Sequence, residues 1–267
     1  MNRKSVTLKS IINKERRLVI NAPEKYGSLY IHVFVVRSLV DSFFKSYSGN
    51  FDAGADLFLR FHTELRNFYL LTYFSLVRLH SDQAVLNLRR MTEACSNMAY
   101  CIAKPKYEEF VNTDKFGILD PSQSLKNKRN NWLKENYSDR SKDILKIKAP
   151  MQTIAHSNLI STFKTSKHVI RKLKPIRTYT YFFDKDKDDI DLTNVGLWQL
   201  ANTGLACLNL IYEVNRDYKK INFLDNYGAL HSDILRENLI FKDSFQNSDR
   251  FKKVGEIEKL KEDKDLN

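Results

Sequence analysis

Apolar residues that recur every three or four positions from Asp56 to His80 constrain the fold more than any other feature of this sequence. That spacing is the period of one face of an α-helix, so it predicts one long helix over this stretch. A second helix is expected to follow at once, because Ser81 or Asp82 can accept hydrogen bonds from its first free amides. It should end before Pro105, since the residue that precedes a proline is pushed out of helical geometry.

Few residues in the chain would interrupt further helices. It has only 8 glycines and 5 prolines among 267 residues, too few for the many turns of a β-sandwich or barrel. Hydrophobic residues make up 42% of the chain, which is enough to build a core. Further helical patterns run from Ser28 to about Ser46, from about Leu192 to Tyr218 and from about Asp225 to Phe241. We therefore predict a mainly α fold, a helical bundle of about six to seven helices.

One stretch has the pattern of β-structure instead. In "TYTYFF", residues 178–183, aromatic side chains dominate and alternate with threonine, which is typical of a strand. The acidic "DKDKDD" that follows would form a turn leading to Ile190 and Leu192. The sequence therefore predicts one small β-hairpin, at about residues 176–192, inserted in the bundle.

No linker is obvious enough to divide the chain into several domains. We expect a basic N-terminal arm at residues 1–22, a single helical domain at residues 23–247 and a charged C-terminal tail at residues 248–267. The N-terminal stretch lacks the apolar core of a secretory signal, and no apolar run reaches the roughly 20 residues that cross a bilayer. Three cysteines without a CxxC motif favour a reducing compartment over a disulfide framework. These features predict a cytoplasmic protein that binds no membrane.

Positive charge is large and unevenly distributed along the chain. The formal net charge is +12, and residues 101–180 contain 17 Lys and Arg against 7 Asp and Glu. A concentrated positive field suits RNA or another polyanion as a partner. The alternative is that these lysines and arginines simply form a solvated surface.

The strongest candidate for contact with a polyanion is "FKTSKHVIRKLKPIR", which contains no acidic residue. Its candidate nucleic-acid-binding residues are Lys164, Lys167, Arg171, Lys172, Lys174 and Arg177. On a helix, Lys164, Lys167 and Arg171 would share a face that could follow a phosphate backbone. Tyr179 and Tyr181 lie close by in sequence and could stack on bases. The stretch could equally pair with the acidic residues of the predicted hairpin.

The second long helix contains charged residues within its apolar pattern. Arg89 and Glu93 are four residues apart, so they share a helix face and can form an ion pair. Three interpretations remain open: a pair at the surface rim, a buried pair that fixes helix register, or a polar site that faces a cleft. In the last case His156 could complete an Arg–Glu–His cluster that titrates near neutral pH. His156 could also be an ordinary core or surface histidine.

The stretch "SLVRLHSDQAVLNLRRMTEACSNMAYCIA" resembles the helix–turn–helix core of a group of bacterial all-helical domains of unknown function. Their Leu-Arg-x-x-x-Glu signature is matched by Leu88, Arg89 and Glu93, and their later Ser/Thr-x-x-His element is matched by Thr153 and His156. The group is distantly similar to HEPN domains, the helical nucleotide- and RNA-binding modules of toxin–antitoxin and antiviral systems. The resemblance spans roughly residues 55–215. It implies a binding or regulatory role in bacterial stress or phage defence.

One departure from that pattern bears on catalysis. Catalytic HEPN ribonucleases resemble one another in an Arg followed four to six residues later by a His, and none of the six histidines here follows an arginine at that distance. The resemblance therefore favours a non-catalytic module that binds RNA, a partner protein or a second copy of the chain. The alternative is a degenerate ribonuclease or toxin that uses Arg89, Glu93 and His156. Motifs for metal, nucleotide-phosphate or dinucleotide binding are absent, so we expect no metal and no cofactor.

Overall fold

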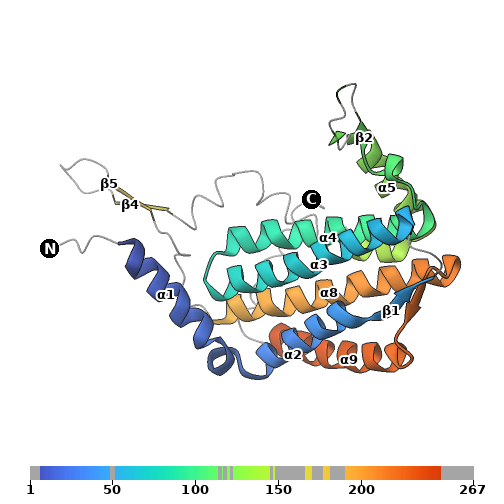
Figure 1. Cartoon of the computed structure of the whole chain (residues 1–267). Helices are drawn as coiled ribbons and strands as arrows, with labels where there is room; N and C mark the ends of the chain where they lie inside the picture. Colours follow the sequence, from blue (N-terminus) through green and yellow to red (C-terminus); the bar gives the residue numbers. More distant parts are fainter. Residues whose placement is uncertain are drawn as a thin grey trace, which may run out of the picture.

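The computed structural model describes residues 7–48, 52–113, 116, 119–120, 123–144, 147, 166–169, 177–180 and 190–247. Within these ranges the chain is mainly α-helical, as predicted from the apolar spacing (Figure 1). The long helices are α1 (Leu8–Ile20), α2 (Ala22–Ser42), α3 (Ala53–Val77), α4 (Ser81–Ala103), α5 (Gln123–Asn136), α8 (Ile190–Tyr218) and α9 (Tyr227–Gln246). Residues 138–144 are also helical, and a short 3₁₀ helix spans Tyr107–Glu109.

Helix α8 lies at the centre of the bundle. It packs against α2, α3, α4 and α9, while α5 lies against one end of α4 (Figure 1). Its side chains in the middle of the helix are completely buried, and they include Leu197, Leu200, Ala201, Leu205, Leu208 and Ile211. In contrast, α1 extends away from the bundle and contains no buried residue. Among the described residues, no helix is long and apolar enough to cross a membrane.

Two-stranded antiparallel pairings complete the described fold. Strand β1 (Phe44–Tyr47) pairs with β6 (Ile221–Phe223), and β2 (Asn112–Thr113) pairs with β3 (Leu119–Asp120). Strand β4 (Ser166–Val169) pairs with β5 (Arg177–Thr180). The pairing of β1 shows that the helix expected up to Ser46 is wrong beyond residue 42, because this segment finds a strand partner at β6.

The predicted hairpin is confirmed in its first strand and wrong in its partner. Strand β5 lies where the threonine–tyrosine alternation placed it, but it pairs with the upstream residues 166–169 rather than with residues after the acidic run. Ile190 and Leu192 belong instead to the first turn of α8, with exposed fractions of 39% and 47%. Asp191 in that turn interacts favourably with the positive end of the helix dipole. Ile190 and Leu192 are therefore helical residues and do not form the second strand of the predicted hairpin.

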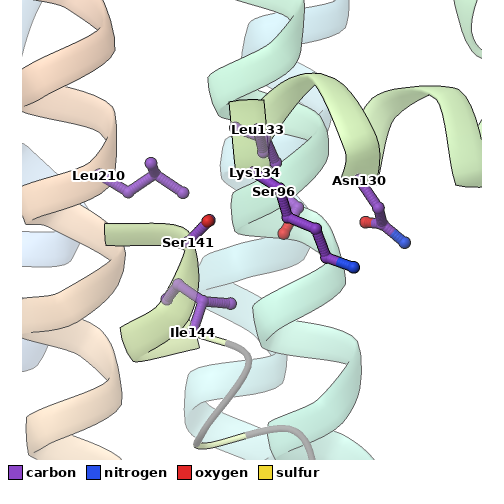
Figure 2. A pocket seen from close by; sticks show the side chains of 7 residues that line it. All are labelled: Ser96, Asn130, Leu133, Lys134, Ser141, Ile144 and Leu210. Carbon is purple, nitrogen blue, oxygen red and sulfur yellow. The ribbon is translucent and has the colours of Figure 1, made fainter. Parts of the chain in front are cut away.

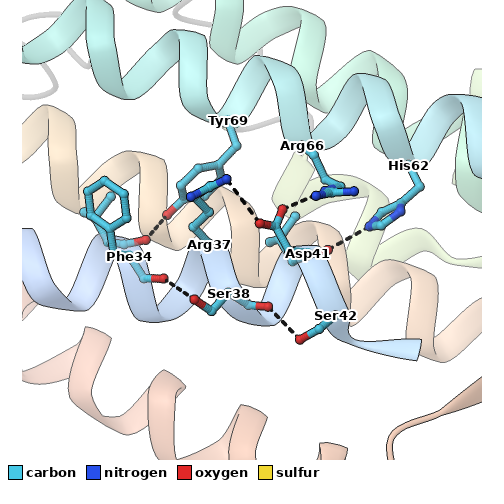
Figure 3. A network of polar contacts seen from close by, with 10 residues as sticks. Phe34, Arg37, Ser38, Asp41, Ser42, His62, Arg66 and Tyr69 are labelled. Atoms are coloured by element: carbon cyan, nitrogen blue, oxygen red, sulfur yellow. Dashed lines mark hydrogen bonds and ion pairs between the residues drawn. The ribbon is translucent and has the colours of Figure 1, made fainter. Parts of the chain in front are cut away.

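Three side chains on one face of α3 hold it against α2 (Figure 3). Tyr69 Oη donates a hydrogen bond of 2.8 Å to the carbonyl of Val33, and Arg66 Nε donates one of 2.8 Å to Asp41. His62 Nε2 donates to the carbonyl of Val40 at 2.8 Å. That carbonyl lies in the last turn of α2 and has no partner within the helix, so His62 caps the end of α2.

We expect the protein to lose stability as the pH falls below about 6.5. Burial lowers the pKa of His62 and of His231 from the ordinary value of 6.5, so both rings are neutral in the folded state. The unfolded chain then binds more protons than the folded chain, and the free energy of unfolding decreases with falling pH. Thermal melts between about pH 7.5 and 5.5 would measure this, with the melting temperature constant at the upper end and falling below about 6.5.

The double variant His62→Gln and His231→Gln is the control for this pH dependence. Glutamine retains an amide that can donate to the carbonyl of Val40 but does not titrate in this range. The melting temperature of the double variant should depend less on pH than that of the wild type. Identical pH profiles for the two proteins would show that neither histidine is the cause.

Candidate functional site

The buried side of α4 determines which of its residues face outward. Leu88, Met91, Cys95 and Met98 are at most 5% exposed and join the core formed with α3 and α8. Arg89, Glu93 and Asn97 follow at intervals of four residues on the adjoining face, which α5 partly covers. The helix ends at Ala103, two residues before Pro105, as the sequence predicts.

Arg89 and Glu93 form an ion pair at a partly exposed position. Arg89 Nε lies 3.4 Å from Glu93 Oε1, and Lys126 Nζ of α5 lies 3.1 Å from the same oxygen. The side chains of Arg89, Glu93 and Lys126 are 26%, 22% and 32% exposed. Of the three interpretations of the pair, the sealed core pair is therefore wrong. Glu93 instead bridges a cation of its own helix and a cation of α5.

An open hollow lies over this group of charges. It has a volume of about 590 Å³ and is bordered by residues of α3, α4 and α5. The residues that line it are Phe68, Leu86, Asn87, Arg89, Arg90, Glu93 and Lys126. We call it the basic hollow, because three of these side chains are cations and one is a carboxylate. Its volume lies within the range of pockets that bind small ligands.

A second polar group fixes α5, and with it Lys126, against α4. Arg129 Nε donates to Asn97 Oδ1 at 3.0 Å, and another guanidinium nitrogen donates to the carbonyl of Glu109 at 3.2 Å. The Glu109 carboxylate accepts from Tyr100 Oη at 2.7 Å and lies 2.7 Å from Lys128 Nζ. The hydrogen bonds from Lys128 and Tyr100 lower the pKa of Glu109, so it stays ionised at neutral pH.

The structure brings together only part of the site predicted from sequence. Arg89 and Glu93 meet, whereas His156 lies outside the described residues, so the three-residue cluster stays a prediction. Four residues of the basic stretch also lie outside the described residues, namely Lys164, Arg171, Lys172 and Lys174. Lys167 and Arg177 lie in the paired strands β4 and β5, where Lys167 is opposite Tyr179. The helical face expected through Lys167 is therefore wrong, because this segment pairs as a strand.

Sequence reasoning missed several residues of the basic hollow. Arg90 was visible beside Arg89, but the spacing used to pair charges did not select it. Lys126 carried no signal, because its contact with Glu93 joins residues 33 positions apart. Phe68 belongs to the apolar pattern between Asp56 and His80, which favours a core position, whereas its side chain is only partly buried and borders the hollow.

Two smaller features of the described residues offer less to a ligand. A pocket of about 20 Å³ between α4, α5, residues 138–144 and α8 has room only for about a water molecule (Figure 2). Its lining residues are Ser96, Asn130, Leu133, Lys134, Ser141, Ile144 and Leu210. A hollow of about 360 Å³ at the end of α8 is bordered by Arg216 and Lys219. Asn215 also lines this hollow, but both polar atoms of its side chain already bond to the backbone of Ile221.

The described residues offer no evident nucleophile or metal centre. Cys95, Cys101 and Cys207 are buried and form no disulfide. Burial raises the pKa of the Cys95 and Cys101 thiols, which keeps them protonated and unreactive at neutral pH. Within the described ranges, no group of three His, Cys, Asp or Glu side chains is placed to hold a metal ion.

Comparison with known proteins gives no relative from which a role could be transferred. No family model, no curated protein and no solved structure matches the chain. The chemistry of the basic hollow is therefore inferred from its own side chains. Three cations, one carboxylate, one amide and two apolar side chains suit an anion that also has an apolar part.

Proposed function

We propose that this protein is an HEPN-like helical module of the bacterial cytoplasm that binds RNA through the basic hollow and acts in stress or phage defence. The observation that carries the proposal is the presence of Arg89, Arg90 and Lys126 around one open hollow. Phosphate oxygens accept hydrogen bonds from guanidinium and ammonium groups, and arginine can bind them through two nitrogens at once.

The ion pairs of Glu93 support this use of the cations. Glu93 contacts Arg89 through Nε, which leaves the two terminal nitrogens of the guanidinium to donate to an incoming phosphate. The same carboxylate holds Lys126 at the opposite helix. Two long side chains are thus already ordered before binding, and less side-chain entropy is lost when RNA arrives.

Neutralising the three cations is expected to weaken RNA binding about tenfold or more at low salt. The test compares the wild type with the triple variant Arg89→Gln, Arg90→Gln and Lys126→Gln, using a labelled single-stranded RNA at several salt concentrations. For single strands each lost phosphate contact reduces the slope of log affinity against log salt by about 0.7, so three contacts reduce it by about 2.

A matched control separates the hollow from the overall charge of the protein. The triple variant Lys25→Gln, Lys45→Gln and Arg236→Gln removes the same charge from α2, β1 and α9, on exposed positions away from α5. Its RNA affinity should remain close to that of the wild type. Equal losses in both variants, or no loss in the first, would contradict the proposal. A further variant without the charges of Lys164, Arg171 and Lys172 tests whether the basic stretch shares the contact.

A second candidate function, a ribonuclease or toxin, is favoured by one observation. The Arg89–Glu93 pair borders an open hollow and is not sealed in the core, so a substrate can reach it. In this proposal His156 joins the pair and acts as the general acid or base. Incubating the same RNA with the protein and separating the products on a denaturing gel tests it. Cleavage that disappears in His156→Ala would support this candidate, and intact RNA would rule it out.

A further inference from the structure

The side chain of Asn87 has an orientation that its neighbours determine. Ser75 Oγ donates its single hydrogen to the carbonyl of Leu71 at 2.8 Å, so towards Asn87 it can only accept. The Asn87 amide nitrogen must therefore be the atom that lies 3.2 Å from Ser75 Oγ.

The consequence is a fixed hydrogen-bond acceptor at the basic hollow. With the amide nitrogen turned to Ser75, the Asn87 carbonyl oxygen points away from it and can accept a hydrogen bond from a ligand. The other lining groups besides Glu93 are donors or apolar side chains. Phe68 of α3 and Leu86 of α4 add apolar surface to the same hollow, and Leu86 is 46% exposed.

We propose that the basic hollow binds one unpaired, amino-bearing base of a single-stranded RNA. The cations hold the adjacent phosphates, the base lies on Phe68 and Leu86, and the Asn87 oxygen accepts a hydrogen bond from the exocyclic amine. Cytosine offers such an amine where uracil offers a carbonyl oxygen, which Asn87 would repel. A base within a duplex has its faces stacked and its amine paired, so it cannot enter the hollow. This inference rests on the proposed function of RNA binding.

The volume of the hollow agrees with a single nucleotide rather than a helix. About 590 Å³ is sufficient for one base with its sugar and phosphate, whereas a duplex would lie across the rim and reach only the exposed cations. Stacking on an aromatic ring tolerates any base. Selectivity between bases must therefore come from the hydrogen-bond acceptors of the hollow, and we assign it to Asn87 because the Glu93 carboxylate is already bound to Arg89 and Lys126.

The test measures the affinity of the full chain for oligocytidine, oligouridine and an RNA duplex of equal length. We expect oligocytidine to bind about fivefold or more tightly than oligouridine, and the duplex to bind more weakly than both. Asn87→Leu should lower the affinity for oligocytidine to that for oligouridine without changing the latter. Phe68→Leu keeps an apolar side chain but removes the ring, and it should weaken both single strands about fivefold or more while sparing the duplex.

The outcomes separate this inference from the function on which it rests. If neutralising Arg89, Arg90 and Lys126 abolishes binding but cytosine and uracil bind equally, the proposed function stands and the base preference is refuted. A base preference that persists in Asn87→Leu refutes the role of Asn87. Melting temperatures of the two single variants, compared with the wild type, establish that each is folded. If Phe68→Leu does not fold, Leu86→Ala replaces it as the test of the apolar surface, because Leu86 is the more exposed of the two residues.

Discussion

Replacing Gly204 with valine is expected to lower the free energy of unfolding by about 3 kcal/mol. Gly204 lies in the buried middle of α8. A β-carbon at this position would come within 3.0 Å of the Tyr69 ring and within 3.0 Å of a methyl group of Val36. Valine adds two further methyl groups to that contact. The ring cannot move aside without weakening the hydrogen bond from Tyr69 to the carbonyl of Val33.

The matched control is Gly228→Ala in the first turn of α9. A β-carbon there meets no atom within 4 Å, and alanine is the better helix former, so this variant should gain about 0.5 kcal/mol. Urea unfolding followed by circular dichroism measures both changes. A midpoint for Gly204→Val equal to that of the wild type would show that α8 does not approach α2 and α3 as closely as described.

Replacing Asn215 with alanine is expected to cost about 3 kcal/mol, because it leaves two backbone groups without partners. Asn215 Oδ1 accepts from the amide of Ile221 at 2.8 Å, and its Nδ2 donates to the carbonyl of Ile221 at 2.8 Å. Both residues are buried, so water cannot easily replace the lost bonds. These bonds hold the start of β6, which pairs with β1 and closes this end of the bundle.

Asn222→Ala provides the comparison for Asn215→Ala. Asn222 is exposed and bonds through its side chain to Ser46 and Ser48 at the surface, so its loss should change stability by no more than about 0.5 kcal/mol. Asn215→Asp retains the acceptor for the Ile221 amide but loses the donor, and an intermediate loss is expected. Equal effects of Asn215→Ala and Asn222→Ala in the same unfolding experiment would contradict the role assigned to Asn215.

Much of the helical framework was predictable because it depends on interactions between near neighbours in sequence. The three-to-four spacing and Pro105 gave the extents of α3 and α4 to within about three residues. The same periodicity put Arg89 and Glu93 on one face, where the structure finds them paired. The strand at Thr178–Thr180 was also evident from local alternation of residue types.

Contacts between residues distant in sequence were decided only by the tertiary structure. Phe44–Tyr47 continues an apolar helical pattern, yet it becomes β1 because β6, more than 170 residues later, supplies its hydrogen-bond partners. The basic hollow likewise depends on three helices that meet in space: α3 contributes Phe68, α4 contributes Asn87 and α5 contributes Lys126. The sequence alone determined that a charged pair lies on an otherwise apolar helix. Packing of α5 against α4 determined that the pair borders a hollow, since the position of an approaching helix is set by the side chains of both partners.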